Sequence, residues 1–252
     1  MKLVVLNTWG FRRADEVLAF IEEHAGATDV FCFQELHSGG SGKTSLEALR
    51  GTYEKLSAQL TDFNAYHLGY GKDTRRESNR SVGSGEHCIG TFVNKNLPSR
   101  IVAVEQFNHL RKEWPDYNGG FSAGAMLATA VGDIVIANVH GLWQGSIKED
   151  TEAKVEQSKI IDQMLRDIVG RKIICGDFNL LPDTEAIKIF SDSYVSLIHE
   201  HGVSDTRGPL YEKPLRHADY VFVDRNVKVE YFSVPEMSIS DHLPLILEFD
   251  AQ

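Results

Sequence analysis

The sequence predicts an α/β protein in which β-sheets pack on each other and helices cover the outside. Short apolar runs typical of strands recur along the whole chain, whereas few segments have helical periodicity. At 252 residues the chain can bury a large core without disulfides. No linker, repeat or low-complexity tract divides it, so we expect one domain over residues 1–252.

The chain opens with a βαβ pattern. Residues 3–6 are an apolar run typical of a buried strand, and residues 29–33 are a second one. Between them, residues 14–25 carry apolar side chains at helical spacing. Thr44-Ser45-Leu46-Glu47 has the form of a capping box, which predicts a helix from there to about Leu60.

The rest of the chain is dominated by strands. Helical spacing returns at residues 151–169, and a short helix is expected at 183–190. Gly132-Asp133 is a plausible hairpin turn between two strands. Strands are expected at residues 63–69, 87–94, 100–107, 122–131, 134–140, 172–175, 219–224, 227–234 and 243–249.

Composition restricts the partners and the compartment. The net charge is −10, which opposes tight non-specific DNA binding but leaves room for a hydrolase that meets phosphate through bound cations. Cys32, Cys88 and Cys175 lie in or beside apolar runs, as expected for buried free thiols in a reducing compartment. No segment has the pattern of a secretory signal or a membrane helix. We therefore expect a cytoplasmic monomer without stable membrane association.

Polar side chains recur at the ends of the expected strands. If these ends share one rim of the sheets, carboxylate, amide and imidazole groups meet in a single cleft. The residues concerned are Asn7, Glu35, Asn138, His140, Asp177, Asn179, Asp219, Asp241 and His242.

Six short motifs appear in an informative order. They are Leu-Asn-Thr-Trp at 6–9, Phe-Gln-Glu at 33–35, Asn-Val-His at 138–140, Gly-Asp-Phe-Asn at 176–179, His-Ala-Asp-Tyr at 217–220 and Ser-Asp-His at 240–242. In this order the chain resembles the endonuclease/exonuclease/phosphatase superfamily over nearly its whole length. The resemblance implies a four-layer αββα sandwich with two mixed β-sheets. It also implies Mg²⁺ or Mn²⁺ as cofactor and in-line attack of water on phosphorus.

The resemblance assigns metal and water to the acidic residues. Glu35 is the expected principal metal ligand with Asn7 beside it, since Mg²⁺ prefers oxygen ligands. Asp241 would touch the metal or the attacking water. Asp177 and Asn179 are two residues apart, which puts both side chains on one side of an extended segment. Asp177 would activate water or bind a second metal, and Asn179 would orient water or donate to phosphoryl oxygens. Turn, cap or solvated-loop roles are the alternatives.

Two histidines have separate expected roles. His242 would take a proton or, as imidazolium, stabilise transition-state charge, with Asp219 fixing its tautomer. His140 resembles a histidine that pairs with a glutamate in pancreatic-type deoxyribonucleases, and Glu86 is placed to match that partner. The pair would protonate the leaving oxygen. A satisfied interior histidine is the alternative for His140.

Basic residues are candidates for substrate binding. The polar segment 67–87 contains Arg75 and Arg76, which could bind substrate phosphate or belong to a solvated loop. Arg207, Lys213 and Arg216 form a weaker second group. The stretch 39–44 resembles a P-loop but lacks the required first glycine.

The sequence leaves three functions open. A phosphodiesterase or nuclease is favoured by the His140–Glu86 pair and the basic loop, and opposed by the net charge of −10. A sphingomyelinase-like or small-molecule phosphoesterase is the first alternative. A binding module that kept the fold without catalysis is the least favoured, because the expected catalytic positions are filled.

Overall fold

Two six-stranded sheets form the centre of the protein. The computed structural model describes residues 1–39, 51–72, 76–77, 80–81, 86–113, 124–145 and 147–250. The first sheet has the order β13-β14-β1-β2-β6-β3. Its strands are β1 (Lys2–Asn7), β2 (Val30–Ser38), β3 (Phe63–Lys72), β6 (Glu86–Asn94), β13 (Val229–Ser233) and β14 (Leu245–Phe249).

The second sheet has the order β11-β12-β10-β9-β8-β7. Its strands are β7 (Ser99–Gln106), β8 (Ala125–Val131), β9 (Ile134–His140), β10 (Arg171–Asp177), β11 (Val195–Ser196) and β12 (Asp219–Val223). Both sheets are mixed: β1 is parallel to β2 but antiparallel to β14, and β10 is parallel to β9 but antiparallel to β12. Two short strands, β4 (Arg76–Glu77) and β5 (Arg80–Ser81), pair separately.

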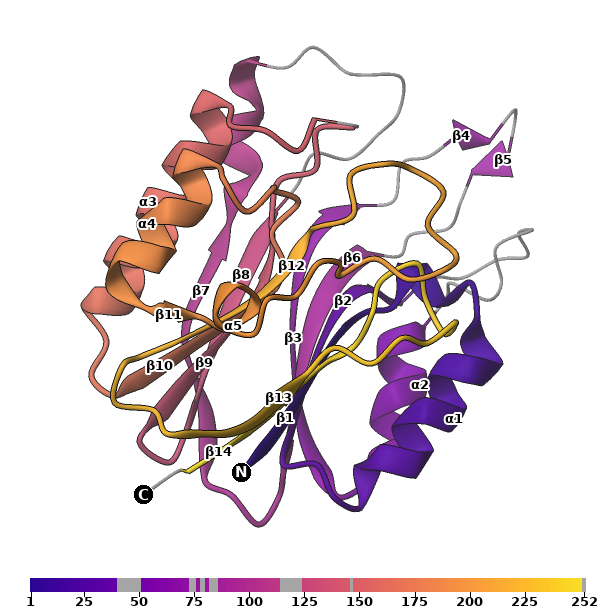
Figure 1. The fold of residues 1–252 in the computed structure, drawn as a ribbon. Helices are drawn as coiled ribbons and strands as arrows, with labels where there is room; N and C mark the ends of the chain where they lie inside the picture. Colours follow the sequence, from indigo (N-terminus) through magenta and orange to yellow (C-terminus); the bar gives the residue numbers. More distant parts are fainter. Residues whose placement is uncertain are drawn as a thin grey trace.

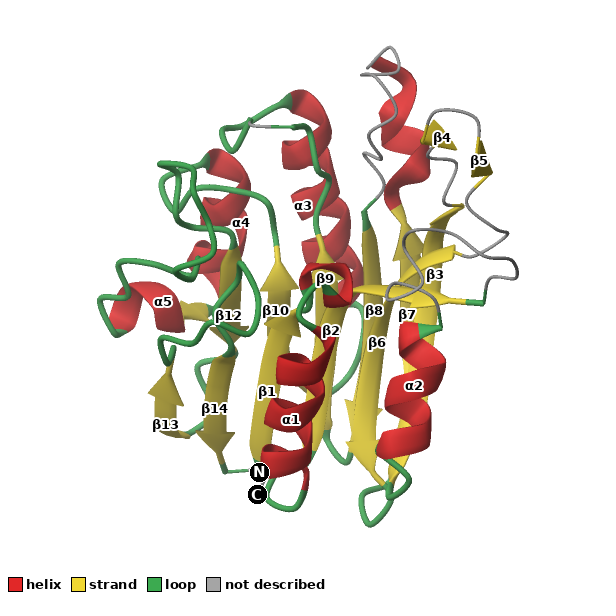
Figure 2. Cartoon of the chain, turned by 90° about the vertical axis from the view of Figure 1, so that its right-hand side faces the viewer, coloured by secondary structure: helices red, strands yellow, loops and turns green. Residues whose placement is uncertain are grey.

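Helices cover both outer faces of the sheet pair. Helices α1 (Ala14–Ala25) and α2 (Thr52–Gln59) lie on the first sheet, and α3 (Glu152–Arg166) and α4 (Glu185–Ser193) on the second (Figures 1 and 2). Shorter helices are η1 (Trp9–Phe11), η3 (Phe107–Glu113) and α5 (Leu197–Glu200). The predicted four-layer sandwich with two mixed sheets is therefore confirmed. None of the helices in the described ranges is long and apolar enough to cross a membrane.

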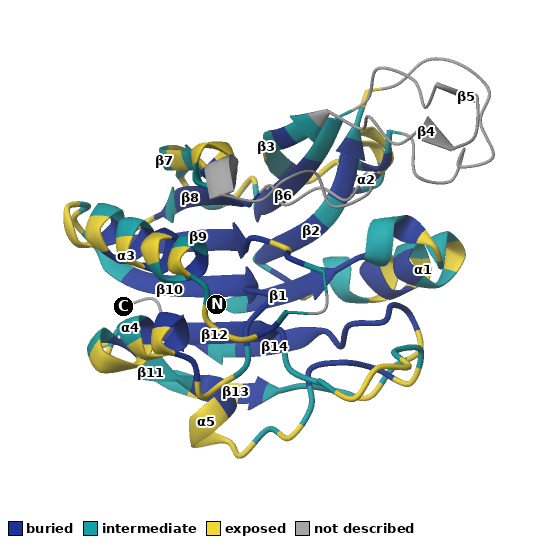
Figure 3. Cartoon of the chain, turned by 90° about the horizontal axis from the view of Figure 1, so that it is seen from above, coloured by how far each residue is buried: buried dark blue, intermediate teal, exposed yellow. Residues whose placement is uncertain are grey.

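The core explains the apolar runs of the sequence. Leu3 and Val5 of β1 belong to the cluster between the sheets, whereas Val4 and Leu6 face the cluster under α1. A strand covered on both faces needs continuous rather than alternating apolar residues. Figure 3 shows the resulting buried strands between partly exposed helices. The strand ends, where chains leave this apolar interior, are the places where polar groups can gather.

Most predicted elements are present, with shifted ends. Helix α1 has the expected bounds, but α2 begins at Thr52 rather than near Thr44. Gly51, which precedes α2, has a left-handed backbone with φ of 57°, and this interrupts any helix running in from earlier residues. The capping-box residues and most of the P-loop-like stretch lie outside the described residues. Strand β10 extends to Asp177, which brings that carboxylate into the sheet.

Candidate active site

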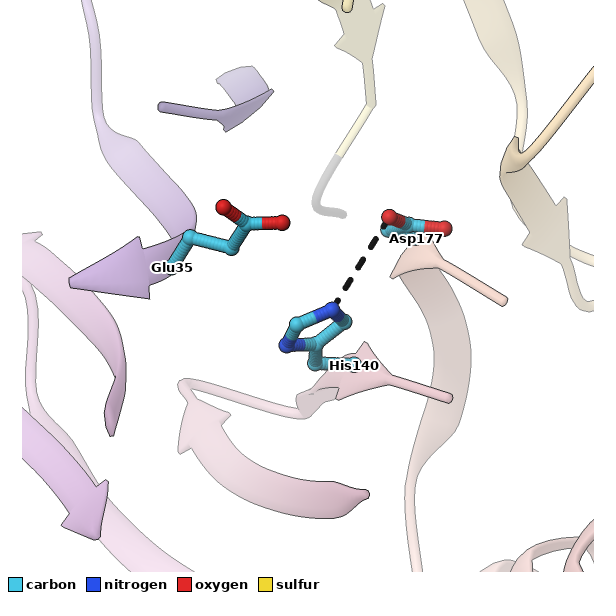
Figure 4. Close-up of side chains that lie close together, drawn as sticks. All are labelled: Glu35, His140 and Asp177. Carbon is cyan, nitrogen blue, oxygen red and sulfur yellow. Dashed lines mark ion pairs between the residues drawn. The ribbon is translucent and has the colours of Figure 1, made fainter. Parts of the chain in front are cut away.

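The polar strand ends lie together at one rim of the two sheets. His140, Asp177 and Asp219 are register partners on β9, β10 and β12, so their side chains stand next to each other. Glu35 comes from β2 of the other sheet, at a register irregularity between Phe33 and Leu36. Figure 4 shows Glu35, His140 and Asp177 pointing toward a common space. The two sheets therefore each contribute part of one site.

The Oδ2 atom of Asp177 is the point on which the other groups converge. Asn7 Nδ2 lies 2.9 Å from it, His242 Nε2 3.6 Å, His140 Nε2 3.9 Å and Arg207 Nη2 4.0 Å. Asp177 itself is only 1 % exposed. Burial raises the pKa of Asp177, but the positive charge of His242 in its protonated form, followed by the charges of Lys148 and Arg207, outweighs this and holds the pKa well below its usual range. Asp177 is thus ionised at any physiological pH.

Asn7 bridges the two sheets. Its Nδ2 donates to Asp177 Oδ2 and to Glu35 Oε1, which is 3.2 Å away. Its Oδ1 accepts from the Trp9 N–H at 3.0 Å. The amide nitrogen, not the oxygen, therefore faces the carboxylates in this structure. Asn7 thus lies between Glu35 and Asp177 and hydrogen-bonds both carboxylates. Its role as a metal ligand stays a prediction.

His242 is fixed by Asp219. The Nδ1 atom of His242 lies 2.9 and 2.8 Å from the two carboxylate oxygens of Asp219. In the Nδ1–H tautomer the ring donates to Asp219, and Nε2 is then an acceptor directed at Asp177. Burial and the nearby Arg207 charge lower the pKa of His242 to about 4. The imidazole is therefore neutral at pH 7.

His140 has a different partner from the one expected. Its Nδ1 lies 2.7 Å from the hydroxyl of Tyr70, and its Nε2 faces Asp177. The carboxylate of Glu86 instead lies over Gly69, where an added Cβ would come within 2.1 Å of its Cδ. The predicted His140–Glu86 pair is thus replaced by a His140–Tyr70 pair. The reason is that β3 continues to Lys72 and carries Tyr70 under the histidine.

Asp241 presents an unsatisfied oxygen to the site. Its Oδ2 accepts from Arg207 Nη1 at 3.0 Å. The backbone of Arg207 also pairs with that of His242 as an isolated antiparallel β-bridge. Its Oδ1 is buried and has no hydrogen-bond partner among the described residues. A carboxylate oxygen without a hydrogen-bond partner beside other acids is a suitable ligand for a divalent cation. Burial is also the largest influence on the pKa of Asp241, which it raises.

The donor set suits a hard divalent ion. Ligand atoms of Glu35, His140 and Asp177 lie within 4.8 Å of one another, and so do those of Asp177, Asp219 and His242. Asp219 and His242 already hydrogen-bond each other, so the first group together with Asp241 Oδ1 is the better candidate for holding an ion. Carboxylate oxygens are the ligands that Mg²⁺ and Mn²⁺ prefer.

Asn179 is occupied at both ends of its amide. Its Oδ1 accepts from Lys148 Nζ at 2.5 Å, and its Nδ2 donates to the Gly141 carbonyl at 3.2 Å. Its backbone N–H donates to Asp177 Oδ1 at 2.8 Å. Asn179 therefore fixes Asp177 and Lys148, whereas the sequence suggested direct contact with water or phosphate.

A cavity of about 380 Å³ opens above these groups. Its rim is aromatic: Trp9, Trp143 and Tyr211 line it, with Arg12 over the Trp9 ring at 4.9 Å and Arg207 over the Tyr211 ring at 4.5 Å. Lys148 and Lys213 add positive charge to the wall. Of the predicted substrate-binding arginines, Arg75 and the side chain of Arg76 lie outside the described residues.

Strained backbone occurs at this cavity, at Trp9, Glu35 and Asn179, and in the neighbouring core at Phe11. Within the described part of the chain, the non-glycine residues with positive φ are Trp9, Phe11, Glu35 and Asn179. Such conformations are unfavourable by roughly 1–3 kcal/mol each and tend to be retained where function requires them. Close packing also demands glycine: a Cβ on Gly141 would lie 2.3 Å from the Phe178 carbonyl oxygen.

Comparison with known proteins identifies the family. The model of the endonuclease/exonuclease/phosphatase family matches residues 4–242. The chain belongs to this family. Its members are phosphoesterases, so the chain is a hydrolase of phosphoester bonds, as the six motifs predict.

Solved structures share the fold of this family member. An endonuclease/exonuclease/phosphatase from Bacteroides vulgatus is 19 % identical, with 100 % of this chain and 98 % of that chain covered and a TM-score of 0.65. The human nocturnin catalytic domain with bound sulfate is 17 % identical, with coverage of 99 % and 93 % and a TM-score of 0.64. A mannosyl-6-phosphatase from Bacteroides thetaiotaomicron is 17 % identical, with 99 % coverage of both chains and a TM-score of 0.62.

Three residues of this family member's site were missed by the sequence reasoning. Tyr70 lies beyond the expected end of its strand, and Lys148 lies in a loop without a motif. Arg207 was noted only as part of a weak basic group. Strand alternation from Tyr66 through Leu68 to Tyr70 was the available signal for Tyr70; the sequence held no comparable signal for Lys148.

Proposed function

We propose that this enzyme hydrolyses a phosphodiester with Mg²⁺ or Mn²⁺, by in-line attack of a water held at Asp177. The observation that carries the proposal is the convergence of two imidazoles, one amide and one guanidinium on a single buried carboxylate oxygen. Carboxylate and imidazole groups meeting in one cavity can bind a cation and move a proton within the same small space.

Glu35, Asp177 and Asp241 would hold the cation. The bound ion supplies Lewis-acid polarisation of a phosphoryl oxygen. The buried Oδ1 of Asp241 supports this role, because it has no hydrogen-bond partner among the described residues. Arg207 on the other oxygen of Asp241 keeps that carboxylate oriented.

Asp177 and His242 would divide the handling of the attacking water. Asp177 is ionised and held by the Asn7 amide, so it would orient the attacking water. His242 is neutral, with Nε2 free to accept that proton and Asp219 ready to stabilise the resulting imidazolium. His140, with Tyr70 behind it, faces the same space and would donate a proton to the leaving oxygen.

A small phosphoester is the second candidate substrate. The cavity is of small-molecule size, with an aromatic rim suited to a planar or sugar group. The net charge of −10 and the absence of a His140–Glu86 pair also weaken a specific case for nucleic acid. A mannosyl-6-phosphatase and a sulfate-bound nocturnin domain among the structural neighbours are compatible with either substrate size.

One assay tests the reaction class and the substrate together. The purified protein is offered bis-p-nitrophenyl phosphate, p-nitrophenyl phosphate, nicked DNA and sphingomyelin, each with Mg²⁺, Mn²⁺ or a chelator. We expect metal-dependent turnover, fastest on the generic diester. Faster cleavage of the monoester would favour the small-phosphoester candidate. Turnover that persists in chelator would contradict the metal-dependent mechanism.

A further inference from the structure

Lys148 is a buried ammonium at the wall of the active-site cavity. It is 4 % exposed and lies in the loop that connects β9 to α3. The main chain around it is fixed, since its carbonyl accepts from Leu181 N at 2.9 Å. Lys148 is therefore held in place by backbone on its own loop and on the loop after β10.

The ammonium of Lys148 has more N–H groups than hydrogen-bond acceptors among the described residues. Of its three N–H groups, one donates to Asn179 Oδ1, and the described residues supply no second hydrogen-bond acceptor. Leaving buried donors of a charged group unpaired is unfavourable by at least ~1–3 kcal/mol. Because Lys148 also lines the cavity, a ligand with acceptor oxygens that enters the cavity can accept from its remaining N–H groups.

The neighbouring buried lysine shows the contrast. Lys154 is completely buried, but its Nζ donates to the carbonyls of Ile147 and Asn179 at 2.7 and 3.0 Å. These bonds tie the loop before Lys148 to the residue that contacts its ammonium. Lys154 therefore has a structural role. It fixes the loop that carries Lys148, whose remaining N–H groups have no hydrogen-bond acceptor among the described residues.

We propose that Lys148 binds a non-bridging oxygen of the substrate phosphoryl group and that Asn179 is its positioning residue. This inference rests on the proposed phosphoester hydrolysis at the same site. Glu35, Asp177 and Asp241 surround the reacting position with negative charge, so an anionic substrate needs a protein cation in addition to the metal. Arg207 is already engaged with Asp241, whereas Lys148 is paired only with a neutral amide.

The test uses Lys148→Met, which keeps the length of the side chain and removes its charge. With the substrate that the wild type turns over best, we expect kcat/KM to fall about 100-fold, the typical effect of losing one transition-state donor. The affinity of the Mg²⁺-loaded protein for inorganic phosphate should fall at least tenfold in calorimetry. Lys172→Met removes a buried charge at the opposite end of β10 and should change neither quantity.

The positioning role of Asn179 has its own readout. Asn179→Ala should lower kcat/KM, but the double variant with Lys148→Met should be no slower than Lys148→Met alone, because the Asn179 side chain acts on the substrate only through Lys148. If the kcat/KM losses of the two single variants multiply in the double variant, the positioning role is overturned. Thermal unfolding separates structure from binding: Lys148→Met should unfold at the wild-type temperature or above, since a buried unpaired charge is removed.

Failure of this inference differs from failure of the proposed function. If the wild type hydrolyses phosphoesters with metal while Lys148→Met keeps wild-type kcat/KM and phosphate affinity, the role of Lys148 is overturned and the reaction stands. If the wild type hydrolyses none of the substrates, the proposed function is overturned. The phosphate affinity measured by calorimetry then decides alone whether Lys148 binds phosphate: a tenfold loss in Lys148→Met supports it, and an unchanged affinity overturns it. Failure of both Lys148→Met and Lys148→Gln to fold would show a structural lysine and overturn the inference.

Discussion

The Nδ1 atom of His242 lies within 2.9 Å of both carboxylate oxygens of Asp219. This pair is buried to about 2 % exposure, and Asp219 is also held through its own N–H by Thr206 Oγ1 at 3.1 Å. The ring can therefore neither turn nor exchange its tautomer without breaking the contact. The reactivity of His242 Nε2 thus depends on a residue that does not itself face the cavity.

Removal of either member of this pair should slow the reaction by a similar factor. We expect His242→Ala to lower kcat at least ~10²-fold and Asp219→Asn about 10²-fold, because both weaken proton acceptance at Nε2. The double variant should be no slower than His242→Ala alone. Steady-state kinetics on the best substrate measures all three. Wild-type rates in His242→Ala would refute the assignment.

Asp177 should be as important as His242. We expect Asp177→Ala to lower kcat at least ~10²-fold, since the oriented water and one metal contact are lost together. Asp192→Ala is the matched control: it removes an exposed carboxylate on α4 and should leave kcat unchanged. Equal kinetics for the two variants would contradict the central place of Asp177.

Metal binding should stabilise the folded protein through the acidic residues. At 100 times the dissociation constant, a ligand adds ~2.7 kcal/mol, which for a chain of this size corresponds to roughly 5–10 °C in Tm. We expect Mg²⁺ or Mn²⁺ to raise the wild-type Tm by that order. Glu35→Gln and Asp241→Asn should show little or no rise in differential scanning fluorimetry. A full shift in Glu35→Gln would exclude Glu35 as the principal ligand.

The hydroxyl of Tyr70 should matter for expulsion of the leaving group. We expect Tyr70→Phe to reduce kcat about tenfold on a diester with a poor alkyl leaving group and much less with p-nitrophenolate, which needs no proton. Tyr66→Phe removes a hydroxyl from the same strand, bonded to the Ser99 carbonyl at 2.9 Å, and serves as control. An equal effect on both leaving groups would speak against proton donation by His140.

Cys88 should make the fold sensitive to alkaline pH. Burial, with the charges of Glu54 and Glu86, raises the pKa of its thiol to about 12 from an ordinary value of 9. The unfolded chain loses this proton above pH 9 while the folded protein keeps it, so stability is full below pH 9 and falls toward pH 12. The slope from one thiol is at most about 1.4 kcal/mol per pH unit.

The comparison of variants isolates that slope. Urea unfolding of Cys88→Ala between pH 8 and 10.5 should show a shallower decline than the wild type. Val93→Ala, a similar loss of buried volume on the same strand without a titrating group, should keep the wild-type slope. Parallel pH profiles for Cys88→Ala and the wild type would rule out this origin of the pH dependence.

The sequence predicted the carboxylates and imidazoles of the site better than their contacts. Asp177, Asp219 and His242 follow or precede buried apolar strands, so their positions could be inferred from strand ends. The partner of His140 could not, because it depends on how far β3 continues beyond residue 69. Likewise, which end of the Asn7 amide faces the carboxylates depends on the turn at Trp9, which no pattern in the sequence specifies.

Loop residues were the least predictable part. Lys148 reaches Asn179 only because Lys154 and Leu181 fix the loop between β9 and α3 from two sides. The contacts of Lys154 with Asn179 and of Leu181 with Lys148 join residues that are far apart in the chain, and local sequence contains no information on them. The structure begins α2 at Thr52, directly after the left-handed backbone of Gly51, and the capping-box residues lie outside the described part of the chain.

The left-handed backbone at Glu35 has a consequence for engineering. A glycine or asparagine at that position would relax the chain and should give a more heat-resistant protein, yet it would remove the carboxylate next to Asn7. Selection for thermal resistance alone would therefore favour losing this glutamate. Its presence, in a conformation that suits it poorly, is the trade-off expected of a working enzyme.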